Sequence, residues 1–165
     1  MINYTYMESP VGRLLLAGDE EGLQLVGFAE GKNQPQPESD WRYHTEPLRS
    51  AVGQLSDYFA GNRRSFDLSL QLRGTPFQLT VWRALQDIPY GRTISYGELA
   101  RRIGNPKASR AVGLANGSNP IAIVVPCHRV IGSNGKLTGY GGGLCHKETL
   151  LALERKHGAA QAALY

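Results

Sequence analysis

The sequence predicts an α+β fold in which a small N-terminal αβ domain with an antiparallel sheet precedes a C-terminal winged helix-turn-helix domain. Short runs in the first third alternate apolar and polar residues, as half-buried strands do. The second part is mainly helical at first, and two of its short helices are joined by a tight glycine turn, the helix-turn-helix pattern. A connector at 73–76 separates the two parts. We therefore expect domains at 1–73 and 74–165.

Three antiparallel strands are expected to open the N-terminal domain. In the first, Ile2, Tyr4 and Tyr6 alternate with polar residues. Residues 13–18 and 23–28 supply the other two strands, on either side of a polar turn that ends in glycine.

The rest of this domain is predicted to contain a loop, a helix and a short strand. Residues 29–40 carry two prolines without periodicity, which favours a loop. A helix is expected from Thr45 to about Gly61. Its apolar face is formed by Leu48, Val52, Leu55 and Phe59. A short strand at 65–70 follows.

The C-terminal domain is expected to begin with three helices. Thr75 and Pro76 can cap and open the first, whose apolar stripe extends to Ile88. Ser95 and Glu98 have the spacing of a capping box for the second, which stops at Gly104. The third is predicted to run from Pro106 to about Gly117.

A buried strand, a wing and a last helix are predicted after this pair. The apolar run 121–125, rich in β-branched residues, is typical of a buried strand. Ser133-Asn-Gly135 is a hairpin-type turn that suits a wing. A final helix is expected at 147–157, stopped by Gly158.

Charge is distributed unevenly along the chain. Residues 1–60 hold four Lys or Arg against nine Asp or Glu, a net charge of −5, whereas 91–150 hold eight against two, a net +6. This asymmetry indicates a polyanionic partner for the C-terminal half, although a solvated basic face would give the same count.

The cysteines and the N-terminus indicate a reducing compartment. No apolar run approaches the roughly 20 residues that span a bilayer, so no membrane association is expected. The first residues lack the basic and apolar regions of a signal peptide. We expect a cytoplasmic protein in which Cys127 and Cys145 are free thiols.

The candidate reactive group is Cys127, which follows a proline at the end of the apolar run. A thiol on a rigid turn is a candidate nucleophile, provided that it is ionised. His128, held by Glu154 or Glu148, has the chemistry of the required base, and the Asn119 amide can return to the turn and fix its backbone. A buried, inert thiol beside a satisfied histidine is the alternative. A zinc site on the two Cys-His pairs, at 127–128 and 145–146, has poor ligand spacing.

The predicted second helix of the pair, 106–117, is rich in small residues. Ser109, Ala111 and Gly113 would let its backbone approach another surface closely, and Arg110 is its central long charged side chain. Glycine in a helix interior costs about 1 kcal/mol, so close approach is a reason for its presence. Tight packing on neighbouring helices is the alternative reason.

Taken together, these motifs resemble those of the O6-alkylguanine-DNA alkyltransferases. The segment 119–132, NPIAIVVPCHRVIG, is similar to the active-site signature of that family. Further matches cover nearly all of 74–155 in order, and they are GTPF at 74–77, IPYG at 88–91, SYG at 95–97, RAVG at 110–113, YGGG at 140–143, and Lys147-Glu148 with Glu154.

The resemblance implies a single-use DNA repair protein with a ribonuclease H-like N-terminal domain and no cofactor or metal. It implies irreversible transfer of an alkyl group from O6-alkylguanine, and from O4-alkylthymine, to Cys127. His128 would act as a base through a water molecule, oriented by Glu154, and Asn119 would tie the turn to this network. Tyr96 would push the target phosphate and donate a proton to guanine.

The remaining implied residues bind the DNA. Arg110 would fill the gap left by the flipped base, while Val130 and Tyr140 would line the guanine pocket. The small-residue helix, with Ser109, Ala111 and Gly113, would lie in the minor groove of double-stranded DNA, independently of base sequence. The expected form in solution is a monomer that can cluster cooperatively on DNA.

The sequence departs from the family pattern in two ways, and two other functions compete with the one that the resemblance implies. No cysteine precedes Cys127, so the N-terminal zinc cluster of some relatives is excluded, and Gly141 stands where animal members carry serine. A DNA-damage binding protein without chemistry would replace Cys127, which is intact. A thiol hydrolase would need an oxyanion-hole loop that the sequence does not show.

Overall fold

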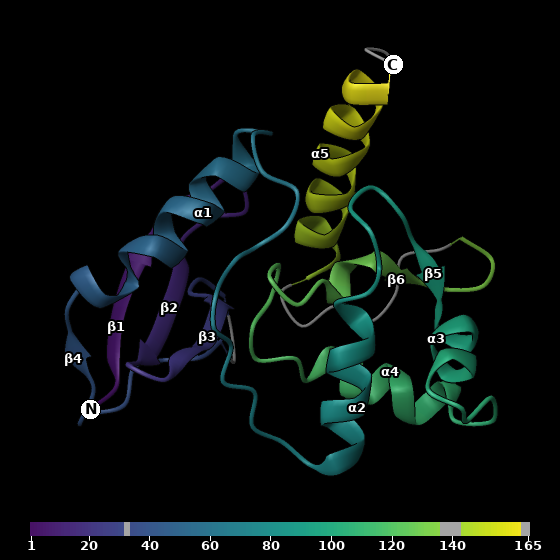
Figure 1. The fold of residues 1–165 in the computed structure, drawn as a ribbon, viewed down its shortest axis with the longest axis horizontal. Coiled ribbons are helices and arrows are strands. Elements are labelled where there is room, and N and C mark those ends of the chain that lie inside the picture. The colour runs from purple at the N-terminus through teal and green to yellow at the C-terminus, as the bar shows by residue number, and fades with distance from the viewer. Residues whose placement is uncertain (32–33, 136–142, 163–165) are drawn as a thin grey trace. The chain divides into compact units, whose positions relative to one another are not determined.

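The computed structural model describes residues 1–31, 34–135 and 143–162, with side chains up to Gly158 in the last range. The chain divides into two compact units, Met1–Arg73 and Gly74–Tyr165. The first is built on a β-sheet, and the second is mainly helical (Figure 1). The predicted α+β class is therefore confirmed.

The first unit contains a four-stranded sheet in the order β3-β2-β1-β4. Strands β1 (Asn3–Met7), β2 (Leu14–Asp19) and β3 (Gly22–Phe28) are antiparallel, as predicted. The two-residue β4 (Arg42–Tyr43) adds to β1 in parallel. It was not predicted, because two exposed residues carry no periodicity.

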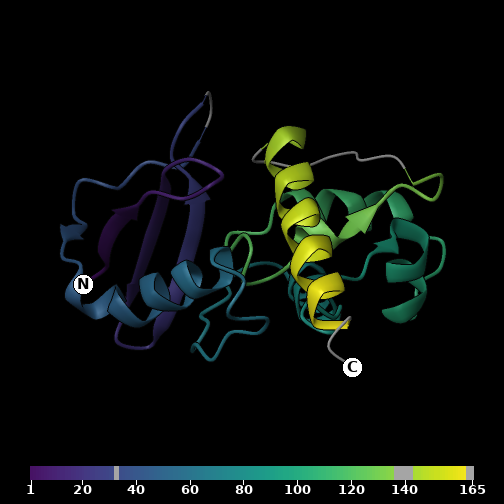
Figure 2. The same ribbon diagram turned by 90° about the horizontal axis from the view of Figure 1, so that it is seen from above.

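A helix covers one face of this sheet, as the two ribbon views show (Figures 1 and 2). A short 3-10 turn, η1 (Glu46–Leu48), leads into α1 (Arg49–Phe59). The predicted apolar face of this helix was partly wrong. The buried residues are Leu48, Ala51, Leu55 and Tyr58, whereas Val52 and Phe59 are only half-buried. Burying the Tyr58 ring removes more apolar surface from water than burying Val52 would. The buried face of the helix therefore contains Tyr58 instead of Val52.

Two further expectations for this unit need correction. In β1 the fully buried positions are Thr5 and Met7, while Tyr4 and Tyr6 are partly exposed and contact each other edge to face. Thr5 is tolerated inside because its hydroxyl shares a 2.8 Å hydrogen bond with that of Thr45. The predicted strand at 65–70 is reduced to one bridge, between Leu23 and Leu70.

The second unit is organised around three helices. Helix α2 (Pro76–Leu85) begins with a complete capping box between Thr75 and Gln78. Helix α3 (Tyr96–Arg102) is capped by Ser95, whose hydroxyl accepts from the amide of Glu98. Helix α4 (Ser109–Gly117) follows after the turn at Gly104. Trp82 of α2 donates a buried 2.8 Å hydrogen bond to the Ala115 carbonyl, which fixes α4 against α2.

The predicted strand at 121–125 is wrong. The segment turns back on itself, with the Val125 amide donating to the Ile121 carbonyl and the Val124 amide to the Ala122 carbonyl. Ile123 has a φ of 74°, a left-handed conformation that is a genuine outlier for a β-branched residue. All five residues are buried. Their apolar character therefore reflects burial in a folded loop rather than pairing in a sheet.

The short 3-10 turn η2 (Cys127–Arg129) leads into β6 (Val130–Ile131), which pairs in parallel with β5 (Ile94–Ser95). The turn at 133–135 is present, closed by the Gly135 amide on the Gly132 carbonyl. The other strand of the predicted wing would lie in 136–142, outside the described residues, so the wing stays a prediction.

Two helix boundaries differ from those predicted. Helix α4 begins at Ser109, three residues after Pro106, because 105–108 form a separate turn closed by the Ala108 amide. Helix α5 (Leu144–Ala162) starts earlier than predicted and continues through Gly158, at a cost of only about 1 kcal/mol for the glycine. Within the described ranges, no helix has the length and apolar character needed to cross a membrane.

Candidate active site

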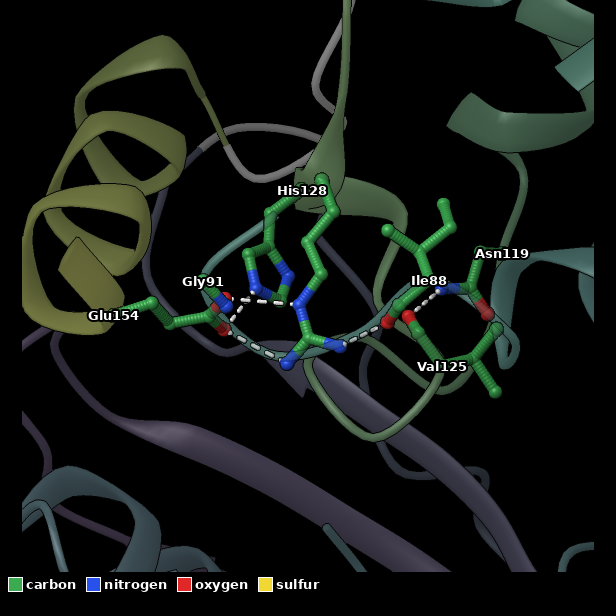
Figure 3. Close-up of polar contacts among 7 residues, drawn as sticks. Ile88, Gly91, Asn119, Val125, His128 and Glu154 are labelled. Carbon is green, nitrogen blue, oxygen red and sulfur yellow. Dashed lines mark hydrogen bonds and ion pairs between the residues drawn. The ribbon is translucent and has the colours of Figure 1, made fainter. Parts of the chain in front are cut away.

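The Cys127 thiol lies on a turn whose backbone is held by several hydrogen bonds. Cys127 is 5% exposed, and its amide donates to the Val125 carbonyl at 2.8 Å. The Asn119 side chain accepts from the Ile121 amide at 3.0 Å and donates to the Val125 carbonyl at 2.8 Å, as Figure 3 shows for the second bond. Asn116 of α4 donates to the Cys127 carbonyl at 3.3 Å. The thiol therefore stands on backbone that side-chain amides hold in place.

His128 and Glu154 form a buried pair. The Nε2 atom of His128 lies 2.6 Å from Oε2 of Glu154, and both side chains point toward each other from η2 and α5 (Figure 3). Because Nε2 faces a carboxylate oxygen, it carries the proton of the neutral ring. Nδ1 is buried and has no hydrogen-bond partner among the described residues. The unprotonated nitrogen is thus the one left to accept a proton.

The Glu154 carboxylate accepts hydrogen bonds from several groups. Besides His128, the Arg129 Nε and Nη2 atoms donate to its two oxygens at 2.9 and 3.0 Å, and the Gly91 amide donates at 3.1 Å. The Nη1 atom of Arg129 donates to the Ile88 carbonyl at 2.6 Å, and its guanidinium lies 5.7 Å from the centre of the Tyr90 ring.

These contacts set the charges at the site. Burial lowers the pKa of His128 below its usual value, against the opposing effect of Glu154, while Arg129 and Lys147 add to the lowering. Burial alone would raise the pKa of Glu154, but the bonds from His128 and Arg129 outweigh it and hold that pKa well below 4.5. The arrangement is a neutral imidazole beside an ionised carboxylate that Arg129 balances.

A second buried cluster joins α5 to α3 and α4. The Lys147 ammonium donates to the Val130 carbonyl at 2.5 Å and lies 5.8 Å from the centre of the Tyr96 ring. Burial lowers the pKa of Lys147 to about 8, and the nearby Cys127 opposes that change. A Cβ atom added to Gly113 would lie 3.8 Å from the same tyrosine ring. Tyr96 therefore packs between the small-residue helix and a buried lysine.

The remaining predicted site residues lie on α4, on β6 or outside the described residues. Arg110 and Ala111 are exposed, and Ser109 and Gly113 are partly exposed. Val130 is buried and opens β6, directly after η2. Tyr140 lies outside the described residues.

Sequence reasoning missed three residues at this site, namely Asn116, Arg129 and Lys147. Asn116 was given no role within the helix predicted at 106–117, and Arg129 and Lys147 were counted with the basic charge of 91–150. One signal was available for Lys147. It precedes Glu154 by seven residues, which is two turns of one helix, so the two side chains had to lie on the same face of that helix.

Neither a disulfide nor a cluster of metal ligands is found among the described residues. Cys127 is buried, Cys145 is exposed, and both are free thiols, as predicted. No three His, Cys, Asp or Glu side chains in the described ranges gather around a common point.

Comparisons with known proteins give a consistent result over both units. Residues 76–156 match the family model described as 6-O-methylguanine DNA methyltransferase, DNA binding domain. Residues 2–72 match the model described as the ribonuclease-like domain of the same methyltransferase.

Curated relatives and solved structures agree with these models. The chain is 60% identical to a Methanosarcina acetivorans protein over 92% of this chain and 97% of the relative. It is 56% identical to a Mycolicibacterium paratuberculosis protein over 100% of this chain and 99% of the relative. Both relatives are named methylated-DNA–protein-cysteine methyltransferase.

Two crystal structures from Mycobacterium tuberculosis are similar to the whole chain. An O6-methylguanine methyltransferase has a TM-score of 0.88 and 52% identity over 95% of this chain and 94% of the other. A structure titled as OGT in complex with DNA has the same TM-score and identity over 94% of each chain.

Proposed function

Because the chain belongs to the 6-O-methylguanine DNA methyltransferase family, we propose that it repairs DNA by moving an alkyl group from O6 of guanine to its own Cys127. The observation that supports this most is the buried Cys127–His128–Glu154 arrangement, in which His128 Nδ1 is left to accept a proton. The relatives named above carry the same activity in their names.

The proposed reaction is a single displacement. The Cys127 proton passes to His128 Nδ1 through a water molecule, and the thiolate attacks the alkyl carbon. The S–C bond forms as the C–O6 bond breaks, and the electron pair of that bond goes to O6. Tyr96 donates a proton to the departing guanine, and exchange with solvent afterwards restores Tyr96 and His128. The thioether has no route back to a thiol, so each molecule reacts once.

The proposed substrate is double-stranded DNA with the damaged base flipped out of the stack. A thiol cannot reach O6 inside a duplex, and extrusion costs a few kcal/mol. Exposed small residues on α4 and the exposed Arg110 support docking of this helix in the minor groove, with Arg110 filling the gap. Val130 and Tyr140 line the pocket for the base. O4-alkylthymine presents an equivalent alkyl–oxygen bond and is a second proposed substrate.

Sequence-independent binding follows from the chemistry of this surface. Exposed basic side chains on α3 and in the turn that connects it to α4 suit phosphates, which carry no base identity. The residues proposed for this role are Arg101, Arg102 and Lys107, whereas Arg110 fills the gap. We propose that the protein is a monomer that clusters cooperatively along DNA, and that it acts in the cytoplasm, where thiols stay reduced.

Mass spectrometry of the cysteine peptides tests this function. The protein is incubated with a duplex that contains one O6-methylguanine, and the peptides that carry Cys127 and Cys145 are weighed. We expect one methyl group per protein on Cys127 and none on Cys145. Cys145→Ser should react normally, whereas Cys127→Ser should not react.

Two results would replace the proposal. An unmodified Cys127 peptide, together with retained binding to the damaged duplex, would indicate a damage-recognition protein without chemistry. More than one methyl group removed per protein molecule would indicate a thiol hydrolase.

A further inference from the structure

Arg129 is a buried charged residue at the site for which the proposed reaction has no role. It is 5% exposed, and all three of its outer nitrogen atoms have acceptors inside the protein. An arginine held on both carboxylate oxygens of a neighbour is geometrically specific, and a lysine cannot reproduce it.

The position of Arg129 matters because Glu154 accepts hydrogen bonds from both Arg129 and His128. The same oxygen, Oε2, accepts from His128 Nε2 at 2.6 Å and from Arg129 Nη2 at 3.0 Å. A buried carboxylate with His128 as its only cationic partner would draw a proton onto that ring, since an opposite charge at this distance favours the charged form. An imidazole that is already charged has no lone pair left for the thiol proton.

We propose that Arg129 is a positioning residue of the alkyl transfer, which balances and orients Glu154 so that His128 stays neutral and ready to accept the Cys127 proton. The inference rests on the function proposed above. Arg129 touches neither the alkyl group nor the nucleobase. It acts through its hydrogen bonds to Glu154 and through its own charge, which opposes protonation of His128.

Three charged groups in the described part of the chain act on His128. Glu154 favours the imidazolium form, whereas Arg129 and Lys147 oppose it, as does burial of the ring. The Lys147 ammonium donates to the Val130 carbonyl. Among the described residues, Arg129 is therefore the cation that pairs with Glu154.

The direct test is a titration of the His128 ring nitrogens by NMR in the free protein. In the wild type, we expect a neutral ring with its proton on Nε2 at pH 7. In Arg129→Met, the titration midpoint should move to higher pH. Arg92→Met removes an exposed arginine near the same site and should leave the midpoint in place. An unchanged midpoint in Arg129→Met would overturn the inference.

The second test is the rate of a single methyl transfer as a function of pH. Arg129→Met should move the acid side of the profile to higher pH, and the rate at pH 7 should fall roughly 10- to 100-fold, as when a residue that orients a catalytic group is removed. Arg129→Lys keeps the charge, so its profile should stay in place while the maximum rate falls. A lower rate in Arg129→Met with no movement of the profile would show a merely structural role and overturn the inference.

A double variant keeps the test decisive if Arg129→Met does not fold. Removing one member of a buried ion pair leaves the other uncompensated, and removing both relieves this. Arg129→Met with Glu154→Gln should therefore fold and have a His128 midpoint no higher than that of the wild type, because the carboxylate that draws the proton is gone, and a higher midpoint would contradict the inference. A wild type that transfers no methyl group would refute the proposed function, while the NMR titration would still test the role of Arg129.

Discussion

The side-chain amide of Asn116 in α4 donates a buried hydrogen bond to the carbonyl of Cys127 over 3.3 Å. A residue of the helix proposed to contact DNA thus holds the backbone of the residue proposed to receive the alkyl group. This bond links α4 directly to the thiol turn. An enlarged side chain at Cys127 would strain the same contact, because the turn is closely packed.

Asn116→Ala should destabilise the protein by about 0.5–1.5 kcal/mol, because it removes one buried hydrogen bond to the Cys127 carbonyl, which keeps its bond from the Val130 amide. Methyl transfer should slow as the turn loosens. Asn105→Ala removes an exposed amide from the turn between α3 and α4 and should change stability by less than about 0.5 kcal/mol. Urea denaturation of the three proteins measures the difference, and equal effects of the two substitutions would contradict this account.

Ile123→Gly should cost less stability than Ile121→Gly. Both isoleucines are 0% exposed and lie in one loop, but only Ile123 has a left-handed backbone. Glycine removes the same buried side chain at both positions and relieves about 1–3 kcal/mol of backbone strain at Ile123 alone. Free energies of unfolding from denaturant titrations give the comparison. A larger loss at position 123 would show that its conformation is not strained.

Lys147 makes stability depend on pH in the alkaline range. Its pKa is about 8 in the folded protein, against 10.5 for an unperturbed lysine. Between these values the unfolded chain binds more protons than the folded one, so stability should rise with pH, by at most about 1.4 kcal/mol per pH unit. Lys147→Met should lack this rise, whereas Lys107→Met, at an exposed position, should keep it. Parallel slopes for wild type and Lys147→Met between pH 8 and about 10 would refute the assignment.

Gly113→Ala should weaken DNA binding without impairing folding. The added Cβ atom would meet the Tyr96 ring at an ordinary contact distance of 3.8 Å, so the fold accommodates it. Alanine should stabilise α4 by roughly 0.5–1 kcal/mol. Affinity for a damaged duplex should nevertheless fall, if this helix lies against the DNA.

The matched control for Gly113 is Gly53→Ala, in the middle of α1. A Cβ atom there meets nothing within 4 Å, so this variant should gain similar stability and bind DNA as the wild type does. Unchanged DNA affinity in Gly113→Ala would mean that this glycine is not at the interface.

The local sequence predicted the elements whose signals lie within a few residues. Thr75 with Gln78 and Ser95 with Glu98 set the starts of α2 and α3, because a cap depends only on hydrogen bonds to the next turn. The strands β1 to β3 followed from alternation and turn residues for the same reason. The signature around Cys127 also indicated the family, since it identifies residue types in order.

Tertiary structure decided what the side chains do with one another. The β-branched run 121–125 is typical of a strand, but buried contacts and the Asn119 amide fold it into a loop. Arg129 and Lys147 are ordinary basic residues in the sequence, and they can be buried because Glu154 and the Val130 carbonyl, distant along the chain, accept their hydrogen bonds. Long-range burial is the physical reason, because it makes an unpaired charge costly and so selects its partner. The sequence by itself determined which thiol to examine, and only the folded chain decided which groups hold it and set the charge of its base.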